Sequence, residues 1–166
     1  MCIRDSYHRG QVHFILGEFE AAMSDYSKST SLDDTFIFSQ VQHAVASYKL
    51  GNIARSTAEF CRILKKFSDS SESYNYFGEL MLDQQRHEDA VANFDKSIAL
   101  EQAKPKGKNV LPMINKALVL FQWKQDLTGA EQLCRDALRI DPDCDVAIAT
   151  LAQLSLQQSK IPEAIE

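Results

Sequence analysis

The sequence predicts an all-α solenoid of repeated helix pairs, and a regular spacing of small and aromatic residues carries this prediction. A small residue returns after 34, 34, 40 and 34 residues, at Ala22, Ser56, Ala90, Ala130 and Ala164. Four residues further on, the first four units place Tyr26, Phe60, Phe94 and Cys134. Twelve residues before the small residue stand Gly10, Ala44, Gly78 and Ala152, with Ala117 one place off in the fourth unit.

A period of 34 residues with these positions is typical of the tetratricopeptide repeat, a helix–turn–helix unit. A small residue in each helix lets the two backbones approach closely, and the aromatic side chain fills the neighbouring groove. Stacked units of this kind form a right-handed superhelix, whose first helices line an extended concave surface. We therefore expect four complete repeats and a truncated fifth.

The repeats are expected at residues 3–36, 37–70, 71–102, 110–144 and 145–166, with Ile161 and Ala164 in the second helix of the last. Pro142 follows the second helix of the fourth repeat, where proline stops a helix from continuing. The longer step contains the segment 103–109, AKPKGKN, which predicts a surface loop. A solvated connector is the simpler interpretation of this basic loop, and a contact site for acidic partners is the alternative.

The first six residues have neither the apolar core nor the cleavage pattern of a secretory signal. Met1–Ser6 reads like the in-frame translation of a sequencing adapter. We expect these residues to be foreign to the natural protein, so that the solenoid occupies residues 7–166.

Charge and composition argue against several classes of protein. A net charge of -5 and an isoelectric point of about 5.4 do not fit the basic surface that nucleic acid or anionic lipid requires. No apolar stretch reaches the ~20 residues of a membrane helix, because Lys116 interrupts the longest candidate at 110–121. Four cysteines without a CxxC pair favour a reducing compartment. We expect a soluble chain that contacts neither nucleic acid nor the membrane directly.

The sequence carries no arrangement that indicates catalysis. No nucleophile lies beside a base, and the six glycines never form a Gly-rich loop after a strand. His8 and His13 point to different faces of a helix, and no nearby cysteine completes a zinc site. His87 and Cys134 occupy packing positions, and Trp123 is expected to anchor the turn after its helix. We expect no enzyme activity, no cofactor and no metal.

First-helix positions that do not pack between repeats are the candidate binding site, since the first helices line the concave surface. By the repeat register these positions are Tyr7, Gln11 and Phe14; Val41, Val45 and Tyr48; Asn75, Glu79 and Leu82; Ile114, Leu118 and Phe121; and Ala149, Gln153 and Leu156. The set is rich in apolar side chains, which predicts a hydrophobic trough for an apolar or amphipathic segment. The alternative is that individual members pack within the superhelix.

Two segments resemble a known receptor family. Tyr7–Asp33 (YHRGQVHFILGEFEAAMSDYSKSTSLD) and Leu151–Ile165 (LAQLSLQQSKIPEAI) are similar to the carboxy-terminal repeats of the seventy-kilodalton import receptor of the mitochondrial outer-membrane translocase, of fungal type. The resemblance implies a non-catalytic receptor on the cytosolic face of the mitochondrial outer membrane. Such a receptor binds hydrophobic preproteins in its concave groove and also contacts other translocase subunits.

In this family a membrane anchor and three repeats that clamp the acidic tails of chaperones precede the later repeats. The clamp uses Lys and Asn in the first unit, Asn in the second, and Lys and Arg in the third. The matching positions here hold Tyr7 and Gln11, then Gln42, then Glu72 and Tyr76, so we expect chaperones to dock only through family regions that this chain lacks. A general tetratricopeptide-repeat scaffold or co-chaperone is the alternative function, and an enzyme domain is the rival from a different class.

Overall fold

The computed structural model describes residues 2–160 of the chain, and over this range it contains nine α-helices and no β-strand. The helices are α1 Ile3–Ile15, α2 Phe19–Leu32, α3 Ile37–Lys49, α4 Ile53–Lys66, α5 Ser71–Asp83, α6 His87–Gln102, α7 Leu111–Lys124, α8 Leu127–Ile140 and α9 Asp145–Lys160. Each of the first four expected repeats therefore holds one helix pair, and the all-α prediction is confirmed. Ile161 and Ala164, expected in the second helix of the fifth repeat, lie outside the described residues.

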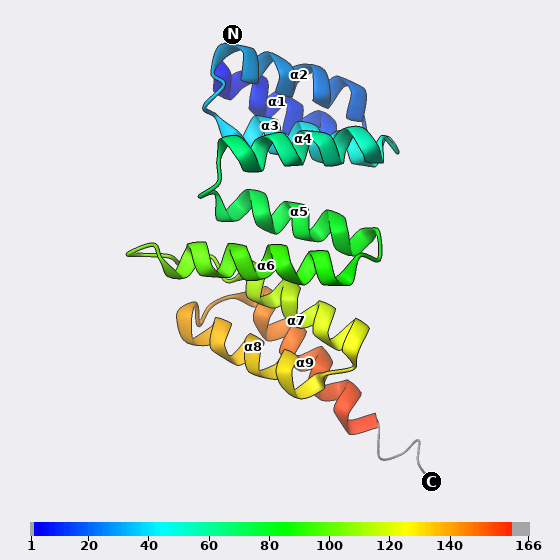
Figure 1. Ribbon diagram of the computed structural model, residues 1–166, viewed down its shortest axis with the longest axis vertical. Helices are drawn as coiled ribbons and strands as arrows, with labels where there is room; N and C mark the ends of the chain where they lie inside the picture. Colours follow the sequence, from blue (N-terminus) through cyan, green and yellow to red (C-terminus); the bar gives the residue numbers. More distant parts are fainter. Residues whose placement is uncertain (1, 161–166) are drawn as a thin grey trace. The chain divides into compact units, whose positions relative to one another are not determined.

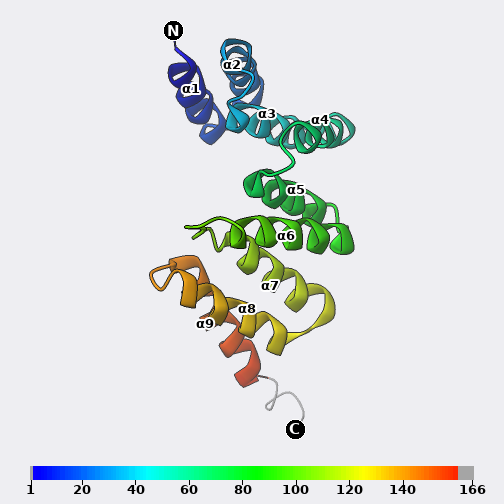
Figure 2. The ribbon, with the colours of Figure 1, turned by 60° about the vertical axis from the view of Figure 1, so that its left-hand side comes forward.

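Two compact units, Met1–Tyr76 and Phe77–Glu166, divide the chain within α5. In the first unit each helix from α1 to α4 packs against the next one in sequence, and Figure 1 shows α2 and α4 in front of α1 and α3. In the second unit α6 to α9 pack in the same successive way, and α7 also contacts α9 (Figure 2). A contact between two first helices is the stacking on which a repeat solenoid depends.

In the first and third helix pairs the glycine of the first helix lies against the aromatic ring of the second. A Cβ added to Gly10 would lie 2.7 Å from Cε1 of Tyr26, and one added to Gly78 would lie 2.6 Å from Cε1 of Phe94. Carbon atoms normally stay ~3.5–4.0 Å apart, so glycine alone fits at these two positions. In the fourth pair Cys134 takes the place of the aromatic, fully buried, and burial raises the pKa of its thiol.

The turn inside each pair is also repeated. Gly17 and Gly51 follow their first helices with φ of 78° and 82°, and Gln85 and Gln125 take the same left-handed conformation with φ of 61° and 54°. A left-handed residue just after a helix ends it, because its geometry lets the last carbonyls find backbone donors. After Gly17, the N–H of Glu18 donates to the carbonyl of His13 over 2.9 Å.

The first helix begins inside the segment that the sequence assigns to a foreign leader. Ile3 starts α1, Ser6 is buried, and the hydroxyl of Ser29 donates to the carbonyl of Ile3 over 3.2 Å. The foreign origin of Met1–Ser6 stays a prediction. Among residues 2–160 no helix combines the length and the apolar character that crossing a membrane requires.

Candidate functional site

In the first unit the predicted binding residues of α1 and α3 lie partly in the core. Tyr7 packs edge-on against Phe36, with ring centroids 5.2 Å apart, and Phe14 packs in the same way on Phe19 at 5.3 Å. Both rings keep part of their surface exposed. The other half-buried members of the predicted set in this unit are Gln11, Val45 and Tyr48.

Three of the predicted binding residues are buried: Val41 is 2%, Asn75 5% and Ile114 0% exposed. The prediction that these three line an open groove is wrong. Each is the first member of its set of three, although the first members of the other two sets, Tyr7 and Ala149, keep exposed surface. For Ile114 the covering residues include Ala137 of α8 and Ala147 of α9.

In the second unit the remaining predicted residues stay accessible. Glu79 is exposed and accepts a hydrogen bond of 2.9 Å from Nδ2 of Asn115, which links α5 to α7. The half-buried members are Leu82, Leu118 and Phe121, and the exposed ones are Ala149, Gln153 and Leu156. The edge of Phe121 packs on the buried cluster of Ala117, Ala130, Cys134 and Leu154.

Three polar atoms of the α1–α2 pair are buried and have no hydrogen-bond partner among the described residues. They are the hydroxyls of Ser6 and Tyr26 and Nε2 of Gln11. Burial is the largest cause that raises the pKa of Tyr26, and the neighbouring Tyr7 and Asp25 raise it further. A buried polar group without a partner lowers the stability of the fold by ~1–3 kcal/mol. These atoms are hydrogen-bonding groups that the described part of the fold leaves unused.

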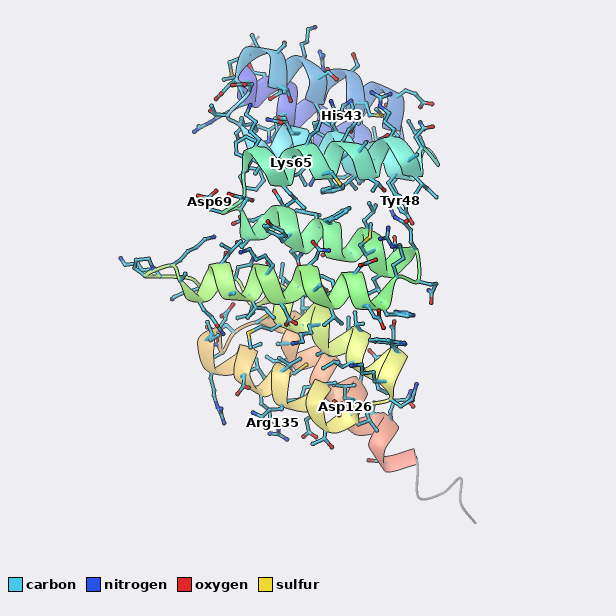
Figure 3. All side chains as sticks on the ribbon, viewed as in Figure 1. His43, Tyr48, Lys65, Asp69, Asp126 and Arg135 are labelled. Carbon is cyan, nitrogen blue, oxygen red and sulfur yellow. The ribbon has the colours of Figure 1, made fainter. Side chains whose placement is uncertain are left out.

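A second candidate site is a groove of about 550 Å³ in the first unit. Residues of α2 and α4 form its two walls, and residues of α3 form its floor. We call it the α2–α4 groove. Figure 3 shows His43 between the ribbons of α2 and α4. The lining residues are Ser27, Thr30, Ser31, Gln40, His43, Glu59, Arg62, Ile63 and Lys66.

Glu59, the one carboxylate that lines the α2–α4 groove, has a partner at each of its two oxygens. Nδ1 of His43 lies 2.8 Å from Oε2 of Glu59, and Nε of Arg55 donates to Oε1 over 2.9 Å. Burial raises the pKa of Glu59, but the hydrogen bonds from His43 and Arg55 outweigh it and hold that pKa below its ordinary value. Glu59 is therefore an ionised group with both oxygens engaged.

Sequence reasoning missed the α2–α4 groove, although a charge count would have found its basic wall. α4 carries four basic residues, Arg55, Arg62, Lys65 and Lys66, against the single acidic Glu59. The sequence instead indicated the basic loop 103–109 as the alternative contact site for acidic partners. Lys104 of that loop forms an ion pair with Glu101.

Trp123 connects the end of α7 to the start of α6. Its ring stacks on His87 with centroids 5.5 Å apart and planes at 17°, and Nζ of Lys124 lies 4.8 Å from its centroid. Trp123 thus braces two helices, which extends the turn-anchoring role expected from the sequence. Across residues 2–160 no group of three or more His, Cys, Asp or Glu side chains could hold a metal ion.

Comparison with known proteins finds relatives across most of the chain. The tetratricopeptide repeat family matches residues 6–36. The mouse protein "Mitochondrial import receptor subunit TOM70" is 30% identical over 167 residues, covering 96% of this chain and 26% of the relative. The Saccharomyces cerevisiae protein of the same name is 32% identical over 163 residues, with 96% and 26% covered. The chain spans about a quarter of the length of the curated relatives it matches.

Solved structures agree with the sequence relatives. The crystal structure of yeast Tom70 superimposes with a TM-score of 0.86 at 30% identity, covering 99% of this chain and 34% of that one. The Pseudomonas aeruginosa pilF structure reaches a TM-score of 0.76 at 19% identity, covering 95% of this chain and 70% of that one, and at this identity it shows the fold alone. These matches confirm the tetratricopeptide-repeat fold and the resemblance to the import receptor that the two sequence segments indicated.

Proposed function

Because the chain folds as tetratricopeptide repeats similar to those of the import receptor subunit TOM70, we propose that it binds hydrophobic segments of mitochondrial preproteins along its first helices. In this role it is a non-catalytic protein-binding module. We place the whole protein at the cytosolic face of the mitochondrial outer membrane, in contact with other translocase subunits.

One observation supports this proposal most directly. Every repeat puts a large apolar side chain at the same position near the end or middle of its first helix, namely Phe14, Tyr48, Leu82, Phe121 and Leu156. All five keep exposed surface, although apolar side chains of this size are normally buried in a folded chain. Partly exposed apolar and aromatic side chains on helix faces are the anchors that receive apolar peptide segments.

The residues at the positions of the chaperone clamp favour an apolar ligand over an acidic one. Two carboxylates of an acidic tail need Lys, Arg and Asn partners. The positions that would supply them hold Tyr7, Gln11, Gln42, Glu72 and Tyr76. A general scaffold for other proteins is the alternative, because the fold is shared with proteins such as pilF at only 19% identity.

The test is a titration of the chain with a fluorescent, apolar segment of a mitochondrial preprotein, at low and at high salt. We expect binding that hardly changes with salt, because apolar contacts are not screened whereas exposed charge pairs are screened within ~8–10 Å. A matched segment with its apolar residues changed to Ser should not bind. Equal binding of the two segments would contradict the proposal.

A further inference from the structure

We propose that the α2–α4 groove is a second binding site, which takes an extended acidic segment of another protein with two acidic residues separated by one residue. The site is independent of the apolar first-helix surface. His43 on its floor lies two residues before Val45, and two residues correspond to ~200° around a helix. The side chains of His43 and Val45 thus lie on opposite faces of α3.

Charge complementarity selects the ligand. The whole chain carries a net charge of -5, yet of the four α4 residues that line the groove, Glu59, Arg62, Ile63 and Lys66, two are basic and one is acidic. That one carboxylate, Glu59, already pairs with Arg55 and lies within hydrogen-bond distance of His43. Arg62 lines the groove and makes no ion pair with any described residue. A basic wall on an acidic protein favours a partner that brings carboxylates.

The spacing of the two cations fits an extended chain. Arg62 and Lys66 are four residues apart on α4, so their Cβ atoms are ~5–6 Å apart on one face. In an extended peptide, side chains two residues apart share a face and are ~6.6 Å apart. The lining residues of α4 run from Glu59 to Lys66, a rise of ~10 Å, which is the length of about three extended residues.

The opposite wall can hold the peptide backbone. The hydroxyl of Thr30 donates to the carbonyl of Tyr26 over 3.0 Å, and that of Ser31 donates to the carbonyl of Lys28 over 2.8 Å. Because both hydroxyl hydrogens are committed, the oxygen lone pairs remain as acceptors for peptide N–H groups. The groove therefore offers cations on α4 and acceptors on α2, which suits an acidic extended segment.

Lys66, one of the two cations in the groove, already pairs with Asp34, which does not itself line the groove. Nζ of Lys66 donates to Oδ2 of Asp34 over 2.6 Å and to its carbonyl over 2.7 Å. The Asp34 side chain is 73% exposed, so an incoming carboxylate can displace it at small cost. Removing the charge of Asp34 should therefore strengthen binding, which is the opposite of the effect expected for Arg62.

The experiment uses the pentapeptide acetyl-Ala-Glu-Ser-Glu-Ala-amide, with acetyl-Ala-Gln-Ser-Gln-Ala-amide as the uncharged control. Amide chemical shifts of the labelled chain are followed during titration. The variants are Arg62→Gln, Asp34→Asn and, as the matched control, Lys65→Gln. Lys65 is exposed and next to Lys66 on the same helix (Figure 3), carries the same charge as Arg62, and does not line the groove.

We expect the Glu peptide to shift amides of α2, α3 and α4 around the groove and the Gln peptide to leave them in place. Arg62→Gln should weaken binding about tenfold, a loss of one charge-assisted contact. Asp34→Asn should tighten binding, and Lys65→Gln should leave it nearly unchanged. Equal shifts with both peptides, shifts confined to other surfaces, or equal losses for Arg62→Gln and Lys65→Gln would each overturn the proposal. The first-helix surface and its apolar ligand are not involved in any of these outcomes.

Discussion

The ring of Tyr26 lies directly on the backbone of Gly10, where an added Cβ would come within 2.7 Å of Cε1. Gly78 and Phe94 repeat this relationship in the third helix pair at 2.6 Å. In both pairs the aromatic ring is fully buried. The contact of an aromatic side chain with a glycine backbone therefore sets how closely the two helices of these pairs approach.

Gly10→Ala should lower the free energy of unfolding by ~1–3 kcal/mol, because the methyl group overpacks the contact with Tyr26. Urea unfolding followed by circular dichroism measures this change. The same substitution in a Tyr26→Leu background should cost less, because the aromatic ring is absent. If the cost is the same in both backgrounds, the contact is not its cause.

Tyr26→Phe should leave the melting temperature unchanged or raise it. The hydroxyl of Tyr26 is buried without a partner among the described residues, and the equivalent positions of the next two pairs already hold Phe60 and Phe94. Deleting an unsatisfied buried group removes its desolvation penalty. A clear drop in melting temperature would show that the hydroxyl has a partner, such as an ordered water molecule.

Gly51→Ala and Gln125→Gly should change stability in opposite directions. Both positions have positive φ after a first helix, and nothing lies within 4 Å of a Cβ at Gly51, so the backbone alone decides the effect there. A left-handed conformation costs a residue with a Cβ ~1–2 kcal/mol. Thermal unfolding should therefore show Gly51→Ala less stable and Gln125→Gly more stable than the parent. The same sign for both would contradict the repeated turn.

The buried carboxylate of Asp25 should make stability depend on acid pH. Hydrogen bonds from Arg9 hold the pKa of Asp25 below its ordinary value of 3.8, against the opposing effect of burial. A pKa that is lower in the folded state stabilises the fold above about pH 4, and this contribution is lost as the pH falls through the folded-state pKa.

In Arg9→Leu the pKa of Asp25 should rise, so the loss of stability on acidification should begin at a higher pH than in the parent. Melting temperatures measured from acid to neutral pH check this. Arg4→Leu, on an exposed residue of the same helix, is the control. Identical pH profiles for the parent and Arg9→Leu would rule out the ion pair as the cause.

The repeat period predicted the helix pairs because they depend on local spacing. It placed the aromatic side chain in the neighbouring groove, whereas the structure puts the ring of Tyr26 on Gly10 of the same pair. The period also gives the direction in which a side chain leaves its helix. It does not give how much of that side chain its neighbours cover, and Val41, Asn75 and Ile114, which were predicted to be open, are buried.

The α2–α4 groove could not be predicted from the repeat pattern. Its walls combine residues of α2 and α4 with Gln40 and His43 of α3, and these helices belong to two different repeats. The ion pair between Lys66 and Asp34 joins residues 32 positions apart, a relationship that only the folded chain brings together. The excess of basic residues on α4 was the one signal in the sequence.

Binding of an apolar preprotein segment to Tyr48→Ala and Phe121→Ala tests the central claim most directly. Each substitution should weaken binding about tenfold, because large apolar anchors contribute ~1–2 kcal/mol or more. Ile53→Ala, at an exposed apolar residue at the start of α4, is the control and should bind like the parent. Circular dichroism should confirm that all three variants are folded. Unchanged binding in both first-helix variants, or an equal loss in Ile53→Ala, would contradict the first-helix surface as the preprotein site.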